Sequence, residues 1–326
     1  MMEIYKITET EWLQLAIEEA TWSGKRYQAP RILKFNLFYT SKNGHEITGV
    51  YEGDTILFKW KGKELFRGTV WKRDLTLKSV VSITCYDKMQ YLLTNKDVYV
   101  FNNQRLDQIA TRVLNDFDIA KGNIPYTGFT IKSLVFSSVT SGYDIILKAI
   151  SETYKQTGNM YRVFSRAGKI ELATWNNPDD IYLLEEYKNI IDVNLTTSIE
   201  EAITKVKVIL TKGKKTYYGH AKDDYTNEKY GNIQYTESVS DNLNQAQLNE
   251  RAKQLLNAKK GLNIDLSATF VGVPDIVSGV PVQANIPRYA IKQKYYVDSD
   301  THTFKGTSHT TNVTLIKENK IPEVGL

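Results

Sequence analysis

The period of the hydrophobic pattern changes twice along this chain of 326 residues. In the first and last parts apolar residues alternate with polar ones, which is the spacing of a strand with one buried face. In the middle part apolar residues recur every three or four positions, which is the spacing of one helix face. We therefore predict an α+β protein with three parts: a β-rich block over 1–98, a mixed module over 99–190 and a second β-rich block over 191–320.

The first block carries alternating apolar residues in short runs separated by turns. Gly68 could allow a bulge in one of these strands. The expected strands cover 13–17, 33–39 and 81–85, with a hairpin over 56–71 that turns at Lys61–Gly62 and a loop at 41–46. A sheet of about five or six strands with one buried face tends to curl, because twist accumulates and closure removes exposed edges. We therefore expect a small antiparallel β-barrel.

The middle module has two helical patterns. The first begins at Asn103, a plausible N-cap, and runs to Asp118. Its apolar face consists of Leu106, Ile109, Ala110, Val113, Leu114 and Phe117. The second begins at Ser141, has Asp144 three residues later and ends at Gly158, a residue type that tolerates the left-handed conformation. A hairpin over 160–174 is expected to follow it.

The last block returns to strand periodicity. Strands are expected at 206–210, 262–270, 280–282, 295–297 and 310–316. A helix near 242–260, capped by Asp241 and ended by Gly261, interrupts them. We predict a second small barrel with an inserted helix, followed by a flexible tail at 321–326.

The residues that enzymes and metal centres need are scattered. Only His302 and His309 are close together among the four histidines, and they would share a face if they lay across a hairpin. Two imidazoles without a third ligand make a weak zinc site. The adjacent acidic pairs are Glu18–Glu19, Asp179–Asp180, Glu185–Glu186 and Asp223–Asp224. Neighbouring strand residues face opposite ways, so solvated turns explain these pairs better than a two-carboxylate site.

Other chemical signatures are also missing. The sequence has no nucleophile elbow, no dinucleotide fingerprint and no phosphate-binding Walker loop. Cys85 lies in an apolar strand and is expected to be a buried, unreactive thiol, and the lysines of 212–215 are expected to form a solvated turn. We predict no catalytic, cofactor-binding or metal-binding residues, and hence no enzyme. The 21 tyrosines favour assembly through protein interfaces.

Charge and hydropathy limit the environment of the chain. A single cysteine excludes an intrachain disulfide, and no run of 18 apolar residues could insert into a membrane. The first residues lack the basic and apolar parts of a signal peptide, so we expect the chain to be made and folded in a cytoplasm. The net charge of +5 is spread along the chain, which disfavours a dedicated nucleic-acid-binding domain.

Several short motifs, spread over nearly the whole chain, are similar to those of one protein family. They are Gly53–Asp54, Leu65-Phe66-x-Gly68, Tyr86–Asp87, Thr157–Gly158 and Tyr295-Tyr296-Val297. Together with the order of the segments around them, they are similar to the baseplate hub of contractile phage tails, as in the T-even phages. The nearest branch is the PBSX-type hub of prophages and R-type bacteriocins.

The resemblance implies a non-enzymatic homotrimer with two similar barrels per subunit. Its six barrels would match a hexameric tail tube on one side and a trimeric spike on the other. The implied partners are further copies of the chain, the tail tube protein, the spike and other baseplate proteins. DNA would be only passing cargo, in the tail of a virion or a phage-tail-like particle. Two alternatives stay open: an OB-like nucleic-acid-binding protein, tested by oligonucleotide retention, and a tail-associated cell-wall hydrolase, tested by zymography.

Overall fold

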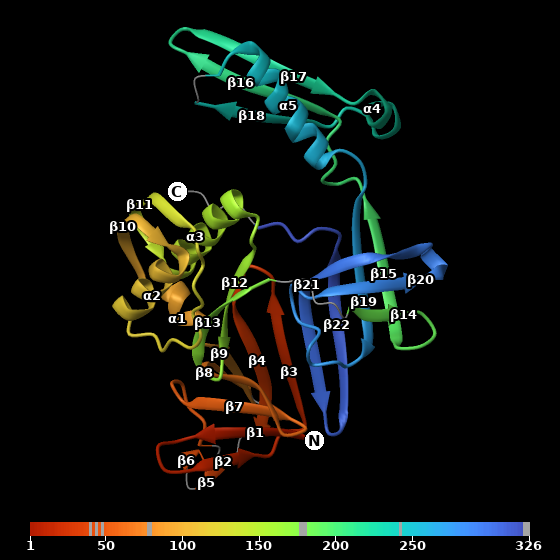
Figure 1. Cartoon of the computed structure of the whole chain (residues 1–326). Coiled ribbons are helices and arrows are strands. Elements are labelled where there is room, and N and C mark those ends of the chain that lie inside the picture. The colour runs from red at the N-terminus through yellow and green to blue at the C-terminus, as the bar shows by residue number, and fades with distance from the viewer. Residues whose placement is uncertain are drawn as a thin grey trace. The chain divides into compact units, whose positions relative to one another are not determined.

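The computed structural model describes residues 1–38, 41–42, 45–46, 49–76, 80–175, 181–240 and 243–321 (Figure 1). The chain forms two compact units, one made of Met1–Val193 with Ser267–Leu326 and the other of Asn194–Leu266. Most described elements are strands, and five α-helices accompany them. The α+β class predicted from the sequence is confirmed.

One open sheet of thirteen strands dominates the first unit. Its strands are β1 (Met2–Ile7), β2 (Trp12–Leu15), β3 (Glu19–Lys25), β4 (Gln28–Phe38), β7 (Thr55–Trp60), β8 (Lys63–Thr76), β9 (Val80–Asp87), β14 (Tyr182–Glu185), β15 (Ile190–Ser198), β19 (Asn263–Val271), β20 (Pro281–Ile286), β21 (Ile291–Lys305) and β22 (Ser308–Ile316). Eleven of them follow the order β15-β19-β22-β21-β3-β4-β9-β8-β7-β1-β2, while β20 pairs with β21 and β14 with β20.

Pairing between β3 and β21 joins the two ends of the sequence in this sheet. Ser299 lies opposite Lys25, and the antiparallel ladder continues to Lys305 opposite Glu19. The expectation of two closed barrels is therefore wrong for the described strands, which form open sheets. A β-rich block closes into a barrel when it must hide its own edges, whereas here β3 and β21 cover each other's edge.

The predicted strands of the first block lie close to their expected positions, whereas β1 and β3 were not predicted. The first predicted strand is shorter than expected, because β2 ends at Leu15, and a two-residue pair of β5 (Ser41–Lys42) and β6 (His45–Glu46) occupies the expected loop. The β7–β8 hairpin turns at Lys61–Gly62 as predicted. Gly68 is not the bulge, since it pairs in register with Ile56. A Cβ atom there would lie 2.3 Å from the carbonyl oxygen of Tyr86, so close backbone approach requires the glycine.

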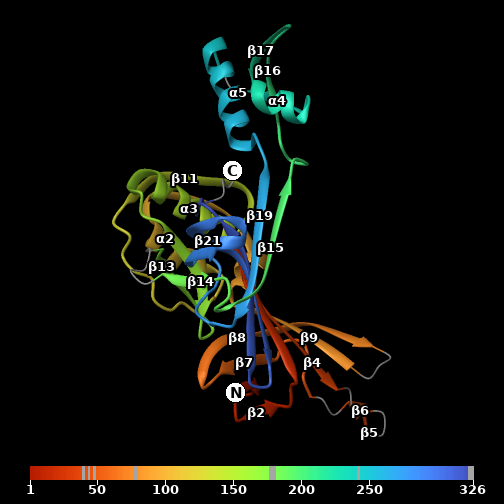
Figure 2. The same cartoon turned by 90° about the vertical axis from the view of Figure 1, so that its right-hand side faces the viewer.

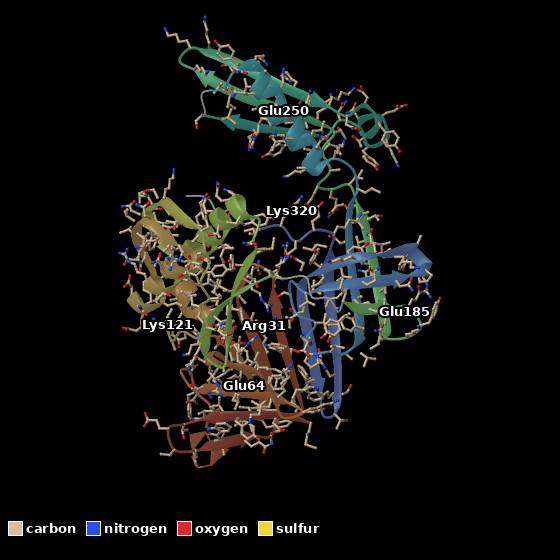
Figure 3. The ribbon with its side chains drawn as sticks, in the orientation of Figure 1. Arg31, Glu64, Lys121, Glu185, Glu250 and Lys320 are labelled. Atoms are coloured by element: carbon tan, nitrogen blue, oxygen red, sulfur yellow. The ribbon has the colours of Figure 1, made fainter. Side chains whose placement is uncertain are left out.

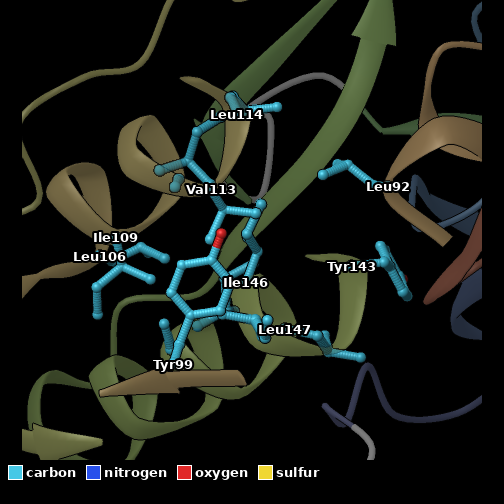
Figure 4. Close-up of a cluster of buried hydrophobic side chains, with 14 of the residues drawn as sticks. Leu92, Tyr99, Leu106, Ile109, Val113, Leu114, Tyr143, Ile146 and Leu147 are labelled. Carbon is cyan, nitrogen blue, oxygen red and sulfur yellow. The ribbon is translucent and has the colours of Figure 1, made fainter. Parts of the chain in front are cut away.

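The middle module packs α1 (Met89–Thr94), α2 (Leu106–Asp116) and α3 (Gly142–Thr157) with two hairpins, β10 (Lys96–Arg105) with β11 (Thr130–Ser141) and β12 (Tyr161–Arg166) with β13 (Lys169–Thr174). Figure 4 shows Leu106, Ile109 and Val113 of α2 gathered with Ile146 and Leu147 of α3. All five side chains are buried in one core, which confirms the apolar face predicted for α2.

The predicted helix ends are right for α3 and wrong for α2. The Ser141 hydroxyl accepts a hydrogen bond from the Asp144 amide, and Gly158 ends α3 in the left-handed conformation. Asn103 does not cap α2, because it belongs to β10; Arg105 holds the N-cap position. The helix signal at Asn103 is overridden by the long-range β10–β11 ladder.

The second unit interrupts the last β-rich block between β15 and β19. Its sheet holds β16 (Lys205–Lys212), β17 (Lys215–Lys222) and β18 (Gln234–Val239), and its helices are α4 (Asp224–Tyr230) and α5 (Gln245–Lys259). Leu248, Ala252 and Leu256 of α5 pack with the buried valines of β16. Figure 2 shows β15 and β19, through which the chain leaves and re-enters the large sheet.

The predicted ends of the inserted helix need correction. Asn244 caps α5, and its side chain accepts a hydrogen bond from the Gln247 amide; the predicted cap, Asp241, lies outside the described residues. The helix ends at Lys259, two residues before Gly261. Of the predicted tail only residue 321 is described.

Candidate functional site

A buried ion pair lies where the two ends of the sequence meet. Arg31 of β4 donates to Asp300 of β21 through its two terminal nitrogens, Nη1 and Nη2, and its Nη1 lies 3.1 Å from Oδ1. The Trp22 ring lies 3.9 Å from the guanidinium, and the Ser278 amide donates to the same carboxylate. Burial would raise the pKa of Asp300, but Arg31 and His302 hold it at about 2. This carboxylate therefore stays charged at every pH the protein is expected to meet.

Two histidines extend this polar cluster. His302 Nδ1 lies 3.0 Å from His309 Nε2 and 3.0 Å from Thr311 Oγ1, while His302 Nε2 lies 3.3 Å from Asp300 Oδ2. The two residues share a face across the β21–β22 hairpin, as the sequence suggested. Burial lowers the pKa of His302, and it lowers the pKa of His309 to about 4. Both imidazoles are therefore neutral at pH 7.

A cavity of about 600 Å³ adjoins this cluster within the first unit. Basic side chains outnumber acidic ones in its lining, and Figure 3 labels two of the lining residues, Arg31 and Glu64. The basic residues are Lys25, Arg26, Arg31, Lys63, Arg67, Arg162 and Arg166, and the acidic residues are Glu64, Asp87 and Asp275. Burial raises the pKa of Asp87 to about 7, so this carboxyl carries only part of a negative charge at pH 7 and adds to the basic character of the lining.

Most of these cations already have carboxylate partners. Two of the pairs join Arg67 Nη2 to Glu64 Oε2 at 2.8 Å and Lys63 Nζ to Asp275 Oδ1 at 2.7 Å. The remaining pairs join Lys25 and Arg26 to Asp298, Arg31 to Asp300 and Arg166 to Glu171.

Arg162 differs from the other cations of the cavity. Its guanidinium carbon lies 4.8 Å from the Phe164 ring centre and 5.9 Å from that of Trp175, and within the described part of the chain no carboxylate pairs with it. Burial lowers the pKa of Arg162, and the neighbouring charges of Arg166 and Arg31 lower it further. The cavity thus holds one cation without an anion.

The other sequence candidates lie apart from this site. Cys85 is a buried free cysteine in β9, and burial raises the pKa of its thiol. His220 is exposed on β17, and His45 lies on β6. The predicted turn of 212–215 joins β16 to β17. Lys212 Nζ there donates to the Leu243 carbonyl oxygen at 3.1 Å.

The adjacent acidic residues serve as ion-pair partners and caps. Glu18 pairs with Lys305, Glu185 with Lys188, Glu186 with Arg288, and Asp223 caps α4, whereas Asp179–Asp180 lies outside the described residues. Among described residues, no three histidine, cysteine or acidic side chains are grouped to hold a metal ion.

Sequence reasoning missed Arg31, Asp300 and Arg162. The first two lie 269 positions apart, and no local pattern marks either of them. Arg162 alternates with Tyr161 and Val163 like any exposed strand residue, so only the tertiary structure distinguishes it.

None of the described helices has the length and apolar character needed to cross a membrane.

The fold is shared with solved prophage tail proteins. The 43 kDa tail protein of prophage MuSo2 from Shewanella oneidensis superposes with a TM-score of 0.69 at 14% identity, over 97% of this chain and 98% of that one. A chain of the lidless PdpA–VgrG complex superposes with a TM-score of 0.56 at 14% identity, over 100% of this chain and 66% of that one.

Sequence similarity then places the chain in one family. The YQBQ-like family matches residues 20–316. The phage-like element PBSX protein XkdQ of Bacillus subtilis (strain 168) is 45% identical over 324 residues, 99% of each chain. The chain therefore belongs to the YQBQ-like family. The resemblance to PBSX-type tail baseplate proteins drawn from the sequence is confirmed.

Proposed function

We propose that this chain is the structural baseplate hub of a contractile phage tail or phage-tail-like particle. In this role it adapts a hexameric tail tube to a trimeric spike and catalyses no reaction. The observation that carries the proposal is the β3–β21 pairing, by which one chain contributes both an N-terminal and a C-terminal β-rich block to a single sheet. Three such chains could offer six β-rich blocks to a sixfold tube.

The proposed subunit has the division drawn from the sequence. Blocks 1–98 and 191–320 would alternate around the ring as equivalent tube-like domains, and the module over 99–190 would lie beside them. The small unit Asn194–Leu266 is inserted in the second block, and the described elements between β1 and β9, which are all strands, contain no such insertion. Partners would be the tail tube protein, the spike and neighbouring baseplate proteins, with DNA only passing through.

The number of chains in the ring is the test. Light scattering at micromolar concentration should give about 112 kDa, three times the 37.3 kDa of one chain, either alone or after the spike protein is added. Electron microscopy of native particles should show threefold density at this level, with the two blocks in alternating, superposable positions. A ring of another number, or blocks that do not superpose, would contradict the hub assignment.

A further inference from the structure

Strand β12 presents a free edge to the cavity. Ala167 and Gly168 both have positive φ and form a two-residue turn, so Arg166 and Lys169 beside it are a hydrogen-bonded pair. By alternation, the backbone groups of Arg166, Phe164 and Arg162 bond to β13, while those of Tyr161, Val163 and Ser165 point to the other edge. In the described part of the chain, β13 is the only strand that pairs with β12, and all six residues of β12 line the cavity.

The two faces of β12 differ in chemistry. Arg162, Phe164 and Arg166 lie on one face, whereas Tyr161 and Val163 lie on the other and pack with the core of the middle module. A strand added along the free edge would alternate in the same way. Its side chains beside the arginines should be acidic, and those between them should be apolar.

Charge supports the same kind of occupant. Five of the seven basic side chains in the lining share their charge with carboxylates at 3.6 Å or less, but Arg162 keeps an uncompensated charge between two aromatic rings. A partly buried cation is costly unless an anion pairs with it. A cavity of about 600 Å³ is far larger than one small oxyanion needs and lies in the range that holds sizeable ligands.

We propose that this cavity is the docking site for an extended acidic segment of another protein. The segment adds to β12 as a strand, places a carboxylate against Arg162 and inserts apolar side chains between its acidic ones. The inference rests on the chain being an assembly protein but not on the number of chains in the ring. Peptide binding and light scattering can therefore fail independently.

The first test uses the full chain and a synthetic probe, an acetylated and amidated hexapeptide of alternating glutamate and valine. Binding is followed by calorimetry at low salt and by the fluorescence of Trp22 and Trp175, which line the cavity. We expect Arg162→Gln to weaken binding at least about tenfold, because a charge-assisted hydrogen bond is lost. Arg112→Gln, an exposed change on α2 outside the cavity, should leave affinity unchanged.

Control probes separate the alternatives. A lysine–valine hexapeptide should not bind, and a peptide with three glutamates followed by three valines should bind more weakly than the alternating one. The melting temperature of Arg162→Gln should be no lower than that of the wild type, since an unpaired charge is removed.

Several results would overturn the proposal. The proposal fails if the alternating peptide does not bind or if the block peptide binds equally well. It also fails if inorganic phosphate gives the same calorimetric and fluorescence changes as the alternating peptide, or if Arg162→Gln leaves the affinity unchanged. Self-association of the chain that Arg162→Gln abolishes would assign the cavity to a second copy instead.

Discussion

The Nδ1 atom of His302 lies 3.0 Å from the Nε2 atom of His309, inside the β21–β22 hairpin. Nitrogens at this distance share one proton, so protonating both rings would place two donors against each other. Asp300 favours a charged His302, whereas burial and Arg31 oppose it, and Lys61 opposes a charge on His309. The folded protein therefore holds this pair in its neutral form.

This pair should make the protein sensitive to mild acid. In the unfolded chain His309 takes up a proton near pH 6.5, but in the folded chain only near pH 4. The contribution of His309 to the free energy of unfolding is therefore fully present above about pH 6.5. It is lost as the pH drops toward 4, by up to about 3 kcal/mol. Urea unfolding at pH 7, 6, 5 and 4 measures the loss.

Two variants isolate the contribution of the pair. His309→Gln should lose less stability than the wild type across this pH window, because the titrating ring is gone. His220→Gln removes an exposed imidazole on β17 and should keep the wild-type pH profile. Parallel profiles for His309→Gln and the wild type would contradict the prediction.

The Arg31–Asp300 pair should be a large contributor to stability. The Asp300 side chain is fully buried, and Asp300→Asn would leave the Arg31 guanidinium without its counter-ion. We expect a loss of about 3–5 kcal/mol in the free energy of unfolding. Asp74→Asn breaks an exposed pair with Lys72 and should cost less than about 1 kcal/mol. Similar losses in the two variants would show that Arg31 finds another anion.

Features set by interactions between residues close in sequence could be predicted, whereas features set by long-range pairing could not. Helix α3 was predictable because Ser141 and Gly158 act within one turn of its ends. The start of α2 was not predictable, because Asn103 belongs to β10, whose pairing with β11 places Gln104 opposite Ile131. The shared sheet and its buried ion pair could not be predicted either, because they join the two β-rich ends of the chain. The local pattern of each strand indicates only that one of its faces is buried.

The face of α2 provides a direct test of the middle module. Val113 and Leu114 are completely buried, so Val113→Asp or Leu114→Asp would bury an unpaired carboxylate and should unfold the module. Arg112 is about half exposed, so Arg112→Asp loses only partly solvated contacts with Asp116 and with the Tyr99 and Phe101 rings, and it places a second carboxylate one turn from Asp116. Thermal unfolding should show a loss of more than about 3 kcal/mol for the first two and less than about 1 kcal/mol for the third. Equal melting temperatures would mean that the buried face is misplaced.

The purified chain should hold no stoichiometric zinc, despite the close approach of His302 and His309. Zinc needs at least three protein ligands directed at one point, but Asp300 lies beside the Nε2 atom of His302, on the side of the ring away from His309. The atom near both facing nitrogens is the Thr311 hydroxyl oxygen, at 3.0 and 3.4 Å. Elemental analysis after dialysis should find less than about 0.1 zinc per chain, well below the single ion of a structural site. One zinc per chain that His309→Gln removes would show instead that the hairpin rearranges to bind metal.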